Sequence, residues 1–243
     1  MGMNLIIDLG NTRIKTAVFS NRELIHAEIF TTENILKKLS EIIETHNCKN
    51  AIIAAVGDIE KAEMKELHTK IKLMELNSRT KIPFKNRYET PKTLGVDRIA
   101  LVAAAVLRFP NTNVLIIDAG TCITFDFVDS ERVYHGGAIS PGIKMRYKSL
   151  HAFTEKLPLL EPVNRIQLIG NSTESSIHSG VINGVINEID SVIDQYRKKN
   201  KDLTVVLTGG DVKFLANKLK NGIFANPNFL IEGLNEILIH NLI

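Results

Sequence analysis

Two aspartates in the sequence each follow a copy of the same short aliphatic run, Leu-Ile-Ile, and each lies two residues before a glycine. Asp8 ends the run in "LIIDLGNT", and Asp118 ends it in "LIIDAGT". Ligands of α/β proteins commonly bind at strand ends, where a glycine lets a phosphate approach exposed backbone N–H groups. A nearby carboxylate can hold the cation that accompanies a polyphosphate, directly or through water. The segments therefore predict two contact sites for a triphosphate, and Lys15 could reach the same phosphates.

The alternative is that each Asp-x-Gly is only a tight hairpin turn, because both residue types favour turns for local reasons. A single copy would favour the turn. Two copies, each after the same aliphatic run and each opening a hairpin, favour phosphate binding instead. The sequence contains neither G-x-x-x-x-G-K-[ST] nor G-x-G-x-x-G, which excludes a P-loop or Rossmann nucleotide site.

Around these segments the chain repeats one order of predicted elements, three strands followed by helix, strand and helix. Such a duplication predicts an α/β fold with two similar domains, at 1–110 and 111–243, around a central nucleotide cleft. A helical piece at 96–107 would join them. In the first half we predict strands at 4–8, 13–19, 23–30, 51–57 and 71–76, and helices at 33–45 and 60–69. In the second half we predict strands at 114–118, 122–129, 132–138 and 203–207, with helices after Pro141, at about 173–199 and near Val212.

Composition points to a globular protein in a reducing compartment. The chain has 243 residues, 44% hydrophobic and 23% charged, and no apolar run approaches the ~20 residues of a membrane span. Its two cysteines, Cys48 and Cys122, do not form a disulfide framework. The basic residues are scattered among 27 acidic ones, unlike the clusters of nucleic-acid binders. We therefore expect a cytoplasmic protein that binds neither nucleic acid nor membrane.

A series of motifs along almost the whole chain resembles the type III pantothenate kinases of the actin and sugar-kinase superfamily. They are "DLGNTRIK", "YETPKTLGVDR", "DAGTCITFD", "GGAISPGI", "SLHAFTEKLP", "GNST" and "LTGGD". One small departure is Cys122, where the family usually has alanine. The resemblance implies two duplicated ribonuclease-H-like domains. It also implies ATP-dependent phosphorylation of pantothenate to 4′-phosphopantothenate, the first step of coenzyme A biosynthesis.

Asp97, in "LGVDRIA", is the predicted catalytic residue. Phosphoryl transfer to an alcohol needs a carboxylate that orients the hydroxyl and accepts its proton, and the family assigns this role to the aspartate of G-x-D-R. From the residues alone, a favourable interaction with the helix dipole explains an aspartate here equally well. The resemblance assigns pantothenate binding to Tyr88, Gly95, Val96, Asp97, Arg98 and Thr173. An arginine suits this role because it can pair bidentately with the carboxylate of pantothenate.

The predicted ATP site consists of the first Asp-x-Gly segment and the threonine of the second. The resemblance implies that Asp118 is a ligand of a monovalent cation, K⁺ or NH₄⁺, while Mg²⁺ would arrive with ATP and bridge its phosphates. Asp8 could hold a water of that Mg²⁺. Glycines in "TGGD", 208–211, could admit an adenosine ring, although an ordinary strand-to-helix turn explains them nearly as well. The predicted ATP contacts are Asp8, Leu9, Gly10, Asn11, Thr12, Arg13, Ile14, Lys15 and Thr121.

Thr173 also has a structural explanation, because it lies among three residues suited to cap the following helix. Asn171 and Glu174 have the spacing of a capping box. That helix carries two apolar seams, which predict a homodimer packed on it, as the resembled family implies. The seams are Ile182, Ile186, Ile189, Ile193 and Tyr196, and Ile177, Val181 and Val185.

Two other functions fit the same fold. One is a kinase for another small hydroxylated substrate, and the other is a nucleotide-binding regulatory protein without turnover. The presence of Asp97, Tyr88 and Thr173 argues against the first. The phosphate-facing residues, and a length that leaves no room for a DNA-binding appendage, argue against the second.

Overall fold

The computed structural model describes residues 2–10, 14–31, 33–55 and 61–242. Its contacts divide the chain into two compact units, which we describe separately. Unit 1 contains Met1–Pro110, Arg132–Tyr134 and Phe229–Ile243, and unit 2 contains Asn111–Glu131 and His135–Asn228. The predicted second domain ran to residue 243, whereas the last 15 residues cluster with unit 1 instead.

Unit 1 is built on a five-stranded sheet in the order β3-β2-β1-β4-β5. β1 pairs antiparallel with β2 and parallel with β4, and this pairing places the ends of β1 and β4 at the same edge. The strands are β1 (Met3–Leu9), β2 (Ile14–Ser20), β3 (Glu23–Phe30), β4 (Cys48–Ala55) and β5 (Lys72–Glu75).

The period-two alternation of β1 separates an apolar face from a face that carries polar groups. Leu5, Ile7 and Leu9 pack with α1 (Ile35–His46) in a core that also includes Leu67 of α2 (Lys61–Lys70). On the other face, Asn4 donates from its side chain to Asn235 of α8 (Phe229–Leu242), at 3.0 Å. Asp8 shares that second face, so the end of β1 presents a carboxylate away from the apolar core.

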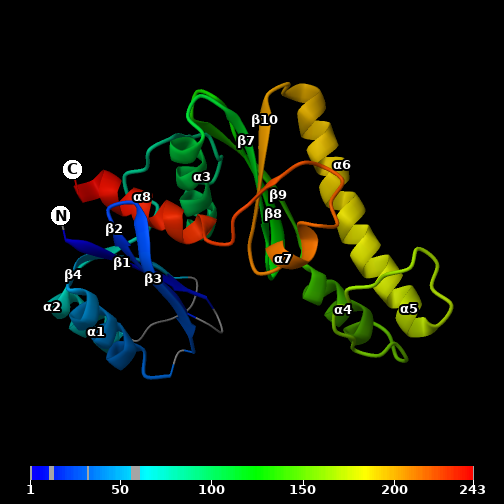
Figure 1. Cartoon of the computed structure of the whole chain (residues 1–243), viewed down its shortest axis with the longest axis horizontal. Coiled ribbons are helices and arrows are strands. Elements are labelled where there is room, and N and C mark those ends of the chain that lie inside the picture. The colour runs from blue at the N-terminus through cyan, green and yellow to red at the C-terminus, as the bar shows by residue number, and fades with distance from the viewer. Residues whose placement is uncertain (1, 11–13, 32, 56–60, 243) are drawn as a thin grey trace. The chain divides into compact units, whose positions relative to one another are not determined.

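The last helix, α8, packs against α3 (Val96–Arg108), as Figure 1 shows. Gly233 makes the close crossing possible, because a Cβ at this position would collide with the carbonyl of Ala100. Arg22 also pairs with Glu236 of α8, with a 2.6 Å contact. These contacts explain why the end of the chain belongs to unit 1 rather than to the unit that precedes it in sequence.

Unit 2 repeats the central part of this topology. Its sheet has the order β11-β10-β7-β8-β9-β6, in which β7 pairs antiparallel with β8 and parallel with β10. β6, which belongs to unit 1, pairs with Val133 and Tyr134 at the start of β9. The bounds are β6 (Lys85–Asn86), β7 (Asn113–Ala119), β8 (Cys122–Val128), β9 (Val133–Pro141), β10 (Leu203–Thr208) and β11 (Phe224–Ala225). The predicted α/β duplication is therefore confirmed.

The predicted long helix at 173–199 contains a turn of π-helix. It consists of α5 (Thr173–His178), the π-turn Ser179–Asn183 and α6 (Gly184–Lys199). At the π-turn, the hydroxyl of Ser179 donates to the carbonyl of Leu168 at 2.6 Å. Unit 2 also contains α4 (Ile143–Ala152) and α7 (Val212–Leu215). None of the helices in the described part of the chain is both long enough and apolar enough to span a bilayer.

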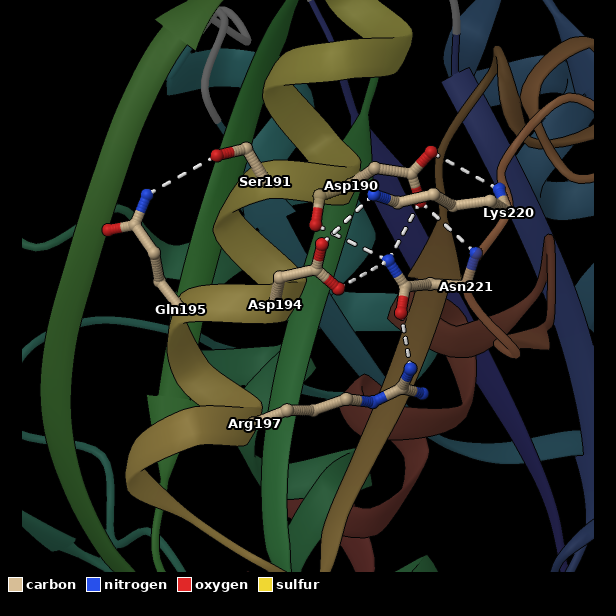
Figure 2. Close-up of polar contacts among 7 residues, drawn as sticks. All are labelled: Asp190, Ser191, Asp194, Gln195, Arg197, Lys220 and Asn221. Atoms are coloured by element: carbon tan, nitrogen blue, oxygen red, sulfur yellow. Dashed lines mark hydrogen bonds and ion pairs between the residues drawn. The ribbon is translucent and has the colours of Figure 1, made fainter.

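A buried carboxylate fastens the segment after α7 to α6 (Figure 2). Asp190, 5% exposed, accepts hydrogen bonds from the backbone N–H groups of Lys220 at 3.2 Å and Asn221 at 3.1 Å. It also accepts from the Asn221 side chain at 2.9 Å. Arg197 donates to the side-chain carbonyl of Asn221, and Lys220 pairs with Asp194 at 3.0 Å. Because β11 follows this segment directly, the network fixes one edge of the unit 2 sheet.

Candidate active site

In unit 1 the side chain of Asp97 folds back onto the start of α3. Gly95 is the N-cap, and Oδ1 of Asp97 accepts a hydrogen bond from the backbone N–H of Arg98 at 2.8 Å. A Cβ on Gly95 would collide with Oδ1, so the glycine leaves room for this conformation. One carboxylate oxygen is thus held by the backbone. Val96 is the first residue of the helix and contributes backbone at this position.

Arg98 and Tyr88 lie in contact beside Asp97. The guanidinium carbon of Arg98 is 5.4 Å from the centroid of the Tyr88 ring, within the range of a cation–π interaction. The Tyr88 ring stacks in turn on Tyr134, with centroids 6.2 Å apart and an interplanar angle of 18°. Arg98 is only 5% exposed, whereas Tyr88 is half-buried. The structure therefore brings together three of the residues predicted to bind pantothenate.

The first Asp-x-Gly segment approaches the same group. Asp8 pairs in register with Lys15 across β1 and β2, which places the two side chains on one face of the sheet. Burial raises the pKa of Asp8 to about 6, Lys15 opposes this rise, and the charge of Asp97 adds to it. Asp8, Lys15 and Asp97 therefore interact electrostatically within unit 1.

The other residues predicted in this segment have different positions. The side chains of Leu9 and Ile14 are buried in the α1 core, so only their backbone could contact a nucleotide. Gly10 follows the end of β1 directly. Asn11, Thr12 and Arg13 lie outside the described residues.

In unit 2 the second Asp-x-Gly segment ends β7 and lies in the middle of a polar row. Asp118 is in register with Thr124 on β8 and with Thr208 on β10, so the three side chains share a face of the sheet. Thr208 is 2% exposed and Thr124 is 9% exposed. Oγ1 of Thr124 is buried, and among the described residues it has no hydrogen-bond partner. Sequence reasoning missed Thr124, although counting by twos across the predicted hairpin would have placed it opposite Asp118.

Two further segments pack closely against residues 118–121. The N–H of Gly142 donates to the carbonyl of Thr121 at 3.1 Å, and a Cβ on Gly142 would collide with the Gly120 and Thr121 carbonyls. Gly209 has φ +96°, and a Cβ there would collide with the carbonyl of Ala119 and with Asp118. The N–H of Asp211 donates to the same Ala119 carbonyl at 2.9 Å.

Asp211 occupies the N-cap position of α7, but its side chain makes no capping hydrogen bond. Burial raises the pKa of its carboxyl group, and the charge of Lys144 opposes the rise. The carboxylate and the lysine thus lie close enough to interact beside the glycines of "TGGD".

The oxygen-rich row suits a hard monovalent cation. Such a cation favours carboxylate, hydroxyl and carbonyl oxygens, and Asp118 and the unpartnered hydroxyl of Thr124 supply the first two kinds. Within the described residues, no three His, Cys, Asp or Glu side chains gather into a metal cluster. Asp118 and Thr124 therefore offer oxygen ligands of the kind that one such cation would need.

Thr173 lines a pocket of about 700 Å³ in unit 2. The N-cap of α5 is Ser172, which forms a capping box with Ser175 in place of the predicted pair Asn171 and Glu174. Thr173 is the first helical residue, so its hydroxyl is not the capping group. The pocket is lined by Arg146, Ser149, Leu150, Leu157, Thr173, Ser176, Ile177, Gly180 and Val181.

The two apolar seams of the predicted dimer helix are accounted for within the chain. Ile182, Val185, Ile189 and Ile193 are 0% exposed and pack against the strands of unit 2. Ile177 and Val181 are also buried, and Ile186 and Tyr196 are partly buried in the same cluster. The seams therefore give no evidence for a partner, and the homodimer stays a prediction. They pack on the sheet because its apolar face, which includes Leu115, Ile117 and Phe125, lies beneath them.

Comparisons with known proteins agree on one family. Residues 4–195 match the family model of type III pantothenate kinase. A type III pantothenate kinase of Christiangramia forsetii is 51% identical over 246 residues, which cover 98% of this chain and 99% of the relative. One from Bacteroides fragilis is 42% identical and covers 98% of each chain.

Solved structures show the same fold at lower identity. A Campylobacter jejuni protein described as a Baf family transcriptional activator has a TM-score of 0.67 at 21% identity, with 98% of each chain covered. A Listeria monocytogenes protein described as an N-acetylmannosamine kinase has a TM-score of 0.55 at 11% identity, covering 99% of this chain and all of that one. The predicted actin-like and sugar-kinase fold is thereby confirmed.

Proposed function

This chain belongs to the type III pantothenate kinase family, and we propose that it transfers the γ-phosphoryl group of ATP to pantothenate. The product is 4′-phosphopantothenate, in the first step of coenzyme A biosynthesis. The observation that carries the proposal is the group formed by Asp97, Asp8, Lys15, Arg98 and Tyr88. In it the Asp97 carboxylate, one oxygen of which accepts from the Arg98 N–H, interacts electrostatically with Asp8 at the strand end that supplies the predicted phosphate contacts.

In the reaction that we propose, Asp97 orients the primary hydroxyl of pantothenate and accepts its proton. The hydroxyl oxygen forms a bond to the γ-phosphorus as the bond from that phosphorus to the bridging oxygen breaks, and the electron pair leaves on ADP. Positioning of the hydroxyl by Asp97 would supply much of the rate. The contact of Asp97 with the Arg98 N–H supports this role, because it holds one oxygen still while the other accepts.

For the acceptor, we propose that Tyr88, Gly95, Val96, Arg98 and Thr173 bind pantothenate. The half-buried ring of Tyr88 offers an apolar surface, and Arg98 supplies positive charge for the carboxylate. Thr173 lines a pocket with the apolar side chains of Leu150 and Leu157, which suits a partly aliphatic substrate.

For the donor, we propose that the segment from Asp8 to Lys15 and Thr121 bind ATP. Mg²⁺ would arrive with ATP and neutralise phosphate charge, and Asp8 is the residue that would hold one of its waters. We propose Asp118 as a ligand of K⁺ or NH₄⁺, which its oxygen-rich row supports. Lys15 lies opposite Asp8 and would contribute a positive charge to the same phosphates.

We further propose that the protein is a homodimer, with a contact surface different from the seams discussed above. Residues 139–169 of unit 2 expose several large apolar side chains, and Phe153 is 88% exposed. Exposed apolar side chains that gather on one surface are typical of an interface. A second copy of the chain is the occupant that we propose, because the family resemblance implies a dimer. The members are Ile139, Met145, Phe153, Leu159, Val163, Leu168 and Ile169.

Measuring the mass of the protein in solution, for the wild type and for Phe153→Asp, tests the dimer. We expect a dimer that dissociates in the variant. A wild-type monomer at micromolar concentration would contradict this part of the proposal.

We also propose a cytoplasmic location, consistent with an ATP-dependent step and with two free cysteines.

A coupled assay of ADP release tests the function itself. Purified protein with ATP, Mg²⁺ and pantothenate should release ADP and form phosphopantothenate, and the rate should rise on addition of K⁺ or NH₄⁺. ATP binding without pantothenate-dependent turnover under either condition would favour the nucleotide-binding regulatory alternative. Faster turnover of a sugar than of pantothenate would favour a kinase for another substrate.

A further inference from the structure

Ser140 and Pro141 end β9 and Gly142 caps α4, and we call these three residues the 140–142 turn. This turn packs directly on the predicted ATP and cation segment. The N–H of Gly142 donates to the carbonyl of Thr121 at 3.1 Å, and the turn is so close that a Cβ on Gly142 would collide with two carbonyls of that segment. Thr121 lies three residues after Asp118. A displacement of this turn would therefore displace the backbone that supports both residues.

The side chain of Arg146, on α4, forms hydrogen bonds to this turn. Nε of Arg146 donates to the carbonyl of Pro141 at 2.9 Å, and a terminal nitrogen donates to Oγ of Ser140 at 3.0 Å. The same terminal nitrogen pairs with a carboxylate oxygen of Glu188 on α6 at 2.5 Å. The Arg146 and Glu188 side chains are 22% and 29% exposed, so water screens their attraction only partly.

These bonds need the geometry of arginine. A guanidinium is planar and presents several N–H donors in a fixed fork, whereas a lysine ammonium is a single point of charge on a flexible stem. Here two different nitrogens of the fork meet three acceptors on two segments, whereas the donors of an ammonium all diverge from one nitrogen. The contacts link α6 to the turn, and the turn to residues 120 and 121.

We propose that Arg146 is a positioning residue for the ATP and cation side of the reaction. It acts through the turn at 140–142 and touches neither substrate in this role. The inference rests on the proposed function, because Thr121 and Asp118 are assigned to ATP and to the cation there. Arg146 also lines the pocket that contains Thr173, so an effect on pantothenate binding is the competing explanation.

Steady-state kinetics of Arg146→Lys and Arg146→Met distinguish the two explanations. We expect KM for ATP and the K⁺ concentration for half-maximal activity to rise about 10-fold, the usual scale for a group that orients a ligand-binding residue. KM for pantothenate should change less than about 3-fold. For Glu188→Gln, KM for ATP and the K⁺ concentration for half-maximal activity should lie between those of the wild type and of Arg146→Met, because Arg146 keeps its contacts with Ser140 and Pro141. Lys148→Met is the matched control, since Lys148 is an exposed cation on the same helix.

A purely structural role would lower the thermal midpoint and leave both ATP and K⁺ parameters unchanged, which would overturn the proposal. So would a rise in KM for pantothenate alone. If Arg146→Met does not fold, Arg146→Lys still tests the fork, because it keeps the charge and the stem.

Direct titration with ATP, in the absence of pantothenate, separates this inference from the proposed function. If the wild type binds ATP but does not turn over pantothenate, weaker binding by Arg146→Lys supports the positioning role while the proposed function fails. If the wild type is an active kinase and Arg146→Lys and Arg146→Met bind ATP as tightly as it does, the positioning role fails alone.

Discussion

Replacing Asp8 by asparagine should stabilise the free protein at neutral pH while it impairs catalysis. The pKa of Asp8 is raised from 3.8 to about 6, mainly because burial disfavours its charged form. The group is ionised in both the folded and the unfolded state above pH 7, so folding there must bury a charge. A difference of about two pKa units corresponds to about 3 kcal/mol of unfavourable free energy.

The sign of the pH dependence follows from proton binding. Between about pH 4 and 6 the folded state binds more protons at Asp8 than the unfolded state does, so this group lowers stability as pH rises. Its contribution is absent below the unfolded pKa and reaches its full unfavourable size above the folded pKa. Asparagine does not titrate and is close in size to aspartate. The Asp8→Asn variant should therefore gain up to about 3 kcal/mol over the wild type at pH 8 and almost nothing at pH 4.

Urea unfolding of both proteins from pH 4 to 8, without ATP or Mg²⁺, measures this difference. Taking the difference between the two proteins removes contributions that they share, including that of Asp211, whose pKa is also raised. Lys15→Met is an informative control, because Lys15 opposes the rise and its loss should lower stability at pH 8. A variant that is no more stable than the wild type at pH 8, with no change between pH 4 and 6, would refute the reasoning.

Three further substitutions test separate parts of the structure. Gly95→Ala should displace the Asp97 carboxylate and lower kcat about 10- to 100-fold with little change in KM for ATP. An unchanged kcat in the ADP-release assay would show that this conformation of the Asp97 side chain is not needed. Thr124→Val should raise the K⁺ concentration for half-maximal activity about 10-fold. It should not lower the thermal midpoint, because it removes a buried hydroxyl without a partner among the described residues. An unchanged K⁺ response would remove Thr124 from the cation site. Asp190→Ala should lower the free energy of unfolding by about 3 kcal/mol, since two backbone N–H groups lose their acceptor. Urea unfolding measures this difference, and a loss below about 1 kcal/mol would contradict the prediction.

The fold was predictable where the pattern was local and repeated. The aliphatic runs before Asp8 and Asp118 identified β1 and β7, and the alternation in the runs that follow identified the antiparallel partners. The position of α8 was not predictable in this way. Its packing on α3 depends on the close approach at Gly233, between residues more than 100 positions apart in the chain.

Features of the site and of the interface that depend on contacts between distant residues were likewise not predictable from local patterns. Asp97 could be proposed from the sequence because its motif is local, whereas Thr124 becomes relevant only when β7 and β8 are placed in register. The cap of α5 was predicted to lie among three residues, but which of them caps depends on the conformation of the turn. On the helical segment 173–199, two seams suggested more apolar surface than one side of a domain needs. The sheet and the neighbouring helices of unit 2 bury almost all of it.

Formation of phosphopantothenate by Asp97→Asn and by the wild type, measured side by side, tests the central claim most directly. The variant keeps the size of the side chain, and titration should show that it binds ATP as the wild type does. The account predicts rapid pantothenate-dependent turnover by the wild type and a rate at least ~100-fold lower in the variant, the usual scale for a positioned base. Near-wild-type turnover by Asp97→Asn would contradict the account.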